Sequence, residues 1–257
     1  MIRTIQRTAH LKAPSPMLCA VLGAVGLHAK SVKHRALFAI RNTITAFDSQ
    51  HQIKDDLHDH QKSALKTVEK HRTIINKARQ VKAEKKQSND KVKVIEAADK
   101  NKWIVLNLTL LDNIVRCEPD IAKEHPYKSM PATAAQGVIR QVVEDFKSAR
   151  KGMDAYDKDP SKFTGRPSMP NYTHDEACSF EIPLGNTCNG HLPALGKKKI
   201  GIDQQCRKFL TTDQKAEWDK FDLGKEIREV GKRLPKGAKP VLFRVTFSAW
   251  DRSVGQI

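Results

Sequence analysis

Apolar residues recur at steps of three and four along most of the first 158 residues, which is the spacing of an α-helix. This spacing predicts a helix over residues 17–47 and a second, long helix over residues 62–87, with a polar loop at 48–61 between them. Residues 103–116 form the most apolar stretch and should be buried. Pro131 marks the start of a further helix, because the first turn does not need the missing N–H, and this helix should run to about Tyr156.

Strand patterns are confined to the two ends of the chain. Residues 2–12 alternate loosely before Pro14 and Pro16, which predicts a short strand followed by a break. After Pro160 the chain is rich in Pro and Gly, as in turns and short strands, and residues 241–247 alternate as a half-buried strand does. The order strand, helices, strands predicts an α+β fold with a helical domain at residues 16–158, flanked by strand-forming segments at 1–15 and 159–257.

One segment near the start imitates a targeting signal. Arg3, Arg7 and Lys12 precede the apolar run 17–27, as in a secretory signal peptide. The run is too short to span a bilayer, and its apolar pattern continues past Lys30 as in an ordinary buried helix. We favour the helix and expect no membrane partner, with the signal peptide as the alternative.

The charge balance indicates a polyanionic partner. The 257 residues contain 46 Lys and Arg against 29 Asp and Glu, a net charge of +17. Such an excess favours nucleic acid as the partner. Residues 62–102 alone carry 13 Lys and Arg against 5 acidic residues. A solvated helical face and a phosphate-facing surface both explain this run, and both explanations stay open.

The sequence offers little for catalysis. The five cysteines are odd in number and irregular in spacing, which argues against disulfides and for a reducing, cytoplasmic location. We interpret Cys178 and Cys188 as ordinary thiols, with zinc binding by Cys178, Cys188 and His191 a distant second explanation. No hydrolase, P-loop or dinucleotide-binding motif is present. The histidines at 51, 58 and 60 stand among aspartates, where a solvated helix start explains them better than a metal site does. The phrase Gly201-Ile202-Asp203 resembles the start of a RuvC nuclease site, but Gln205 replaces the expected glycine, so we interpret it as a chance match.

Residues 127–172 carry the most specific pattern in the chain. Residues 127–136 read YKSMPATAAQ and residues 162–172 read KFTGRPSMPNY. These segments resemble two motifs of the TnpB family of transposon-encoded, RNA-guided DNA endonucleases, which are related to type V CRISPR effectors and to Fanzor: Y-x-x-L-P-x-x-x-A-Q and K-F-x-G-R-P-x-x-P-x-Y. Weaker similarity lies at residues 32–42, 102–115 and 229–247.

The resemblance implies both a fold and a function. It implies a β-barrel wedge domain, OB-like, with a helical recognition domain inserted into it. It implies an RNA-guided DNA-binding module whose partners are a guide RNA and target double-stranded DNA. It does not extend to a RuvC domain, so we expect no cleavage and no cofactor in this chain, since Mg²⁺ would belong to RuvC. The alternatives are a subunit of a split endonuclease with RuvC on a separate chain, and a plain basic RNA-binding protein.

The resemblance and the helix patterns together nominate site residues. By resemblance, Thr133 and Gln136 face the duplex that flanks the target, where a Gln amide can pair with adenine, and Asn186 and Thr187 form a loop facing the same duplex. An exposed helix turn and an ordinary loop turn are the respective alternatives. One remaining set of candidates is a stacking set in the second motif (Phe163, Arg166, Tyr172), with a structural hinge as the alternative for Phe163. The other set is phosphate-binding cations on helices, for which a solvated face is the alternative (Arg41, Arg140, Lys147, Arg150, Lys151).

Overall fold

A computed structural model describes residues 16–48, 50–85, 94–97, 101–117, 125–130, 132–172, 179–183, 212, 215–216 and 242–245. The chain divides into two compact units. Unit 1 comprises Met1–Ser31, Glu124–Gly137 and Asp175–Ile257, and unit 2 comprises Val32–Lys123 and Val138–His174. The predicted first strand at residues 1–15 lies outside the described residues.

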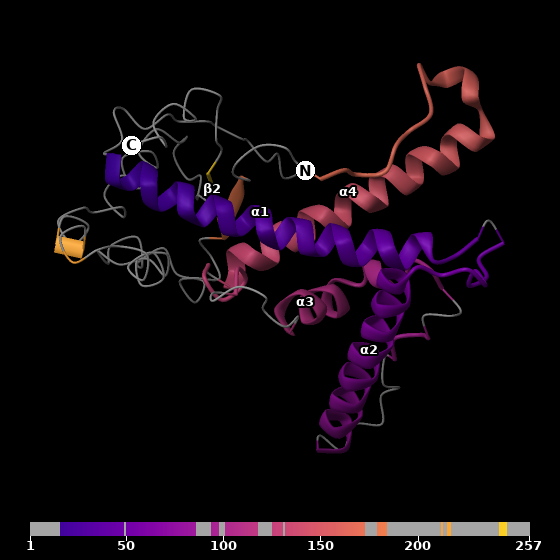
Figure 1. The fold of residues 1–257 in the computed structure, drawn as a ribbon, viewed down its shortest axis with the longest axis horizontal. Helices are drawn as coiled ribbons and strands as arrows, with labels where there is room; N and C mark the ends of the chain where they lie inside the picture. Colours follow the sequence, from indigo (N-terminus) through magenta and orange to yellow (C-terminus); the bar gives the residue numbers. More distant parts are fainter. Residues whose placement is uncertain are drawn as a thin grey trace, which may run out of the picture. The chain divides into compact units, whose positions relative to one another are not determined.

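Helices make up most of the described chain (Figure 1). Their bounds agree with the apolar spacing, because each helix buries the stripe that predicted it. The helix predicted at residues 17–47 and the one predicted from Pro131 are both confirmed. The elements are α1 (Pro16–Thr45), α2 (Asp59–Lys85), the 3₁₀ turn η2 (Ile104–Leu106), α3 (Leu108–Cys117), α4 (Ala132–Lys158) and the 3₁₀ turn η3 (Pro160–Lys162).

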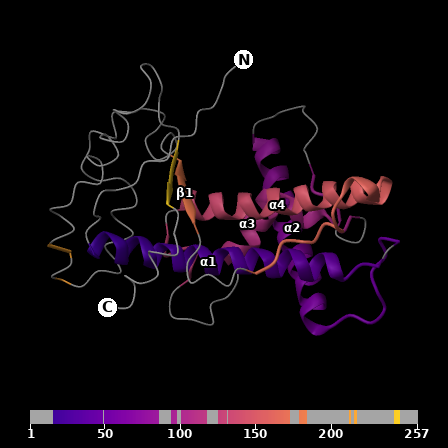
Figure 2. The same ribbon diagram turned by 90° about the horizontal axis from the view of Figure 1, so that it is seen from above.

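The core of unit 2 is mainly aliphatic, with two buried phenylalanines, Phe47 and Phe146. Phe146 of α4 is fully buried, and Leu37 and Ile40 of α1 and Leu110 and Leu111 of α3 are equally inaccessible. Each such side chain contributes on the order of 1.5–3 kcal/mol to stability through its burial. Helix α2 packs against α3 (Figures 1 and 2), and Val68 and Ile75 of α2 are buried.

Side-chain hydrogen bonds fix the start of α2. The Gln61 side-chain oxygen accepts from the backbone N–H of His58 at 2.9 Å, which satisfies a donor at the helix start. The Gln61 amide nitrogen donates to the Thr45 hydroxyl at 3.1 Å and so ties the start of α2 to the end of α1. The turn between them closes where the Asp48 carboxylate accepts from the backbone N–H of Gln52 at 2.8 Å. The predicted polar loop is therefore a compact, hydrogen-bonded connection.

In the described part of unit 1, a buried turn lies at residues 125–130 and a two-stranded ribbon joins β1 (Phe180–Pro183) and β2 (Leu242–Val245). In the turn, the backbone N–H groups of Lys128 and Ser129 donate to the His125 carbonyl at 2.8 and 3.0 Å, and the side chains of Tyr127 and Met130 are buried. Strands β1 and β2 pair antiparallel, with Phe180 opposite Val245 and Pro183 opposite Leu242 (Figure 2).

The predicted fold class is wrong. In the ranges described, the chain is helical apart from the β1–β2 ribbon, and no β-barrel is formed there. Alternation of side chains reveals an individual strand, as at β2, but a barrel needs enough strands to close on themselves, and a local pattern does not supply that number. Residues 159–172, the first part of the Pro- and Gly-rich stretch, form η3 and an extended segment rather than strands, while β1 lies further along this stretch. The fold is therefore assigned to the helical class.

Among the helices that the structure describes, none combines the length and the apolar character needed to cross a bilayer. Helix α1 runs unbroken from Pro16, through the apolar run that imitates a signal peptide, to Thr45.

Candidate nucleic-acid interface

The outer face of α2 carries a row of lysines, which we call the α2 lysine row: Lys62, Lys66, Lys70 and Lys77. All four are exposed, and their spacing of four, four and seven places them on one side of the helix. Val68 and Ile75 lie buried on the opposite side. Between the first and last lysine the one acidic residue is Glu69. This face is therefore strongly positive.

Glu69 does little to neutralise the α2 lysine row. Its two carboxylate oxygens accept from the Arg72 guanidinium, with Arg72 Nε at 2.9 Å from the oxygen that it contacts. Arg72 also donates to the Ile95 carbonyl at 3.2 Å, which holds the guanidinium on the flank of α2 that faces residues 94–97. The carboxylate thus pairs with a cation outside the row.

A second set of cations lies on α4. Arg140, Lys147 and Lys151 are exposed and follow each other at seven and four residues, so they share a face opposite the one that buries Phe146. Lys147 is paired with Glu144, whose carboxylate lies 2.9 Å from the ammonium. Helix α4 carries five Lys and Arg against four Asp and Glu, whereas α2 carries eight against three, so α4 presents less net positive charge than α2.

Arg150 departs from the α4 face and stacks on an aromatic ring. Its guanidinium carbon lies 4.7 Å from the centroid of the Trp103 ring, within the range of a cation–π contact. The ammonium of Lys102 lies 5.7 Å from the same centroid. Burial, and then the nearby Arg150, lower the pKa of Lys102, while Asp48 acts in the opposite direction. Two cations therefore converge on one indole.

The second motif lies in a return segment, residues 159–172, that doubles back from the end of α4 (Figure 1). Phe163 meets Tyr156 of α4 edge to face, with ring centroids 5.7 Å apart. Pro167 lies against Gly152 of the same helix. Phe163, which we predicted from the sequence to stack on a base, thus packs against the preceding helix α4.

The end of the return segment is held by α1. Arg41 donates to the Pro170 carbonyl at 3.2 Å and to the Asn171 side-chain oxygen at 2.7 Å, and its guanidinium lies 5.7 Å from the centroid of the Tyr172 ring. His34 meets the same ring edge to face at 5.1 Å. Arg41, nominated for phosphate, thus makes internal contacts in this structure.

The other nominated residues are placed as follows. Gln136 is exposed and Thr133 is half-exposed in the first two turns of α4. Arg166 is exposed on the return segment. Asn186 and Thr187 lie outside the described residues, as do the Cys178, Cys188 and His191 group and the Gly201–Asp203 phrase.

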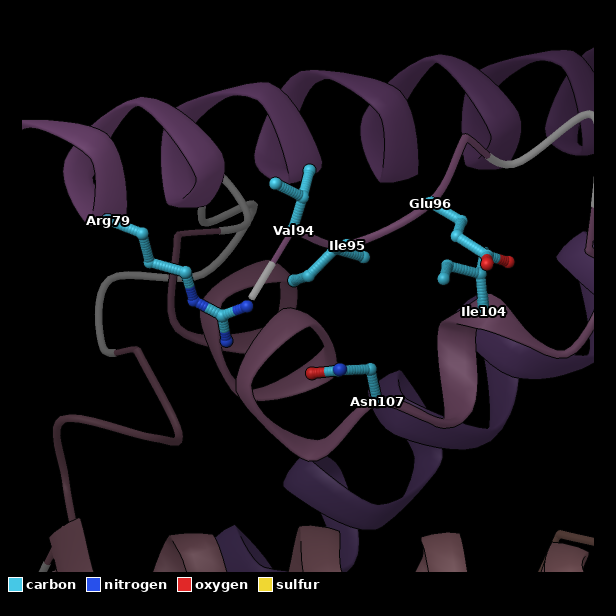
Figure 3. A pocket seen from close by; sticks show the side chains of 6 residues that line it. All are labelled: Arg79, Val94, Ile95, Glu96, Ile104 and Asn107. Carbon is cyan, nitrogen blue, oxygen red and sulfur yellow. The ribbon is translucent and has the colours of Figure 1, made fainter. Parts of the chain in front are cut away.

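An open cavity of about 330 Å³ lies between α2, residues 94–97 and the start of α3 (Figure 3). In Figure 3, the Arg79 guanidinium and the Asn107 carboxamide point toward it. The cavity mixes both signs of charge with aliphatic surface, so it offers phosphate less positive charge than the α2 lysine row does. Its lining is Arg79, Val94, Ile95, Glu96, Ile104 and Asn107.

The histidines near the start of α2 form a ring pair. His58 and His60 stack with centroids 5.4 Å apart. No group of three His, Cys, Asp or Glu side chains within the described ranges is arranged to hold a metal ion.

Comparison of the chain with family models, curated proteins and solved structures finds no match. The TnpB resemblance of residues 127–172 therefore stays a prediction.

Two parts of this surface were not among the site residues predicted from the sequence. The α2 lysine row has a visible signal, because its first three lysines stand four residues apart, close to one helical turn, in a helix that the apolar pattern already predicted. Lys102 and Trp103 have no such signal. They meet Arg150 through tertiary packing, and Arg150 stands 47 positions after Trp103 in the sequence.

Proposed function

We propose that the chain binds nucleic acid through the phosphate backbone, as the RNA-guided DNA-binding module of a TnpB-like protein. The observation that carries this proposal is the α2 lysine row. It is exposed, faces away from the core, and has its one neighbouring acid engaged by Arg72. The support for a guide RNA as the natural ligand is the sequence resemblance at residues 127–172.

The geometry of the row suits a polyanion with regular spacing. From Lys62 to Lys77 the helix rises roughly 22 Å at about 1.5 Å per residue, which is long enough to follow several phosphates of one strand. Lysine is a point charge on a flexible stem, so it contacts phosphate without reading bases. In an RNA-guided protein this division is expected, because base pairing with the guide reads the target.

The RNA that accompanies the chain tests the specific form of the proposal. We would purify the protein from cells that express its own locus and sequence the RNA that remains bound at moderate salt. One dominant structured RNA supports a guide-binding module. A mixed population that leaves as salt rises supports a plain basic RNA-binding protein instead. Protein that carries and binds no nucleic acid would refute both.

Paired charge-removing variants test the surface. Lys66→Gln with Lys70→Gln removes two charges from the α2 lysine row, and Lys54→Gln with Lys128→Gln removes two exposed lysines elsewhere. For duplex RNA, the row variant should lose affinity on the order of tenfold, and its slope of log affinity against log salt should shrink by about 1.5–2. The control pair should change the slope by less than about half a unit. Equal effects of the two pairs would exclude a defined surface.

A further inference from the structure

The side chains of Lys102, Trp103 and Arg150 form a cluster within unit 2 that joins two distant segments. Lys102 and Trp103 directly precede η2, while Arg150 comes from the middle of α4. The Arg150 guanidinium lies 4.7 Å and the Lys102 ammonium 5.7 Å from the centroid of the Trp103 ring. The indole thus gathers two positive charges at one place.

Two like charges held beside one ring repel each other unless an anion accompanies them. Asp48 is near enough to favour the charged form of Lys102, but burial and Arg150 together outweigh it and lower the pKa of Lys102. In the part of the chain that the structure describes, neither Lys102 nor Arg150 forms an ion pair. The cluster therefore holds positive charge that a bound anion would stabilise.

We propose that Lys102 and Arg150, held by Trp103, form a phosphate-binding site. This inference rests on the proposed function for the source of the phosphate, which is the backbone of a nucleic acid. A guanidinium resting on a ring keeps its N–H donors in the plane of the group, where two of them can engage two phosphate oxygens. The ammonium adds a point charge to the same oxygens. Trp103 contributes by holding the guanidinium in place, as a positioning residue.

The indole also explains why the site favours phosphate over a mobile counterion. Arg150 loses little conformational freedom on binding, because its guanidinium already rests on the ring in the unbound chain. The half-buried position of Lys102 and Trp103 limits competing water. An acidic peptide would satisfy the same charges, and it enters the test below as a competitor.

Chemical labelling of lysines tests the site without a measurement of RNA affinity. The full-length protein would be treated briefly with an amine-acetylating reagent at pH 8 and mapped by peptide mass spectrometry. Lys102 should react faster than the exposed Lys54, because a lowered pKa leaves more free amine. Millimolar pyrophosphate, and separately duplex RNA, should each slow labelling of Lys102 at least threefold and leave Lys54 unchanged. Polyglutamate of matched charge should protect less.

Substitutions distinguish the contribution of the two charges to binding from that of the ring. Lys102→Gln and Arg150→Met should each reduce RNA affinity roughly five- to tenfold and the salt slope by about one. Trp103→Leu keeps both charges and should still weaken binding, while Trp103→Phe should restore most of it. Circular dichroism would confirm that each variant is folded, and Lys128→Gln serves as the matched control for charge.

The results of these tests distinguish failure of the phosphate site from failure of the proposed function. If the protein binds no RNA while pyrophosphate still protects Lys102, the phosphate site stands and the nucleic-acid function fails. If RNA binds but protects Lys102 no more than Lys54, and the salt slope of Lys102→Gln equals that of Lys128→Gln, the phosphate site is refuted. Protection by polyglutamate equal to that by RNA would also refute it.

Discussion

The carboxamide of Asn76 and the peptide group of Ile95 hold each other by two hydrogen bonds. The Asn76 amide nitrogen donates to the Ile95 carbonyl at 2.9 Å, and the Ile95 N–H donates to the Asn76 side-chain oxygen, also at 2.9 Å. Both residues are buried, with exposed fractions of 8% and 3%. A side chain of α2 thus acts as a strand partner for residues 94–97 and fixes one wall of the cavity in Figure 3.

Replacing Asn76 with Ala should destabilise the protein by about 2–3 kcal/mol, because the Ile95 N–H would be buried without a partner. Urea unfolding followed by circular dichroism measures the change. Asn42→Ala is the matched control, since that side chain donates within its own helix to the Phe38 carbonyl at 2.9 Å. The control should lose less than about 1 kcal/mol. Equal losses would contradict the special place of Asn76.

Replacing Arg41 separates internal support from phosphate binding. Arg41→Met removes the hydrogen bonds to Pro170 and Asn171, and Arg41→Lys keeps the charge but loses the forked geometry. If Arg41 mainly holds the return segment, both variants should speed limited proteolysis within residues 163–172 about tenfold or more, a cost of about 1–2 kcal/mol. If it mainly binds phosphate, RNA affinity should fall in the Met variant alone and the proteolysis rate should stay unchanged.

A small substitution at Gly152 tests how closely the return segment packs. A Cβ added there would lie 3.5 Å from Pro167 Cβ, an ordinary contact distance. Gly152→Ala should therefore stabilise the protein by about 0.5–1 kcal/mol through helix propensity. Gly152→Leu should displace Pro167 and cost stability. At Gly23 in α1 no heavy atom lies within 4 Å of an added Cβ, so Gly23→Leu should carry no such penalty in thermal unfolding.

Helix positions could be predicted because each helix buries an apolar stripe, and the three- and four-residue spacing of apolar residues in the sequence marks this stripe. Val138, Val142 and Phe146 are buried in α4 for this reason. The stretch 103–116 was predicted as one buried unit, but it divides at Asn107, whose side chain accepts from the Leu110 N–H at 3.2 Å and so begins α3. Asparagine before an apolar run is a known start signal.

Partners distant in sequence could not be predicted in this way. Spacing tells which face of a helix is buried, but not which polar group meets it, so the pairing of Asn76 with Ile95 and of Arg150 with Trp103 left no local pattern. The barrel prediction failed for a related reason. Alternation identified the strand that became β2, but it does not count how many other strands join it.

The buried histidine of α2 should make stability fall in acid. His71 is 6% exposed, its Nδ1 has no hydrogen-bond partner, and burial, followed by the nearby Lys70 and Arg116, lowers the pKa of His71 from its ordinary value of 6.5. The unfolded chain therefore binds the proton more readily than the folded chain does, and the stability present above pH 6.5 decreases as pH falls toward the folded pKa. Urea midpoints at pH 7.5 and 5.5 should differ in the native protein and differ less in His71→Gln. His125→Gln, a second buried histidine, is the comparison, and an unchanged difference in His71→Gln would assign the acid sensitivity to other groups.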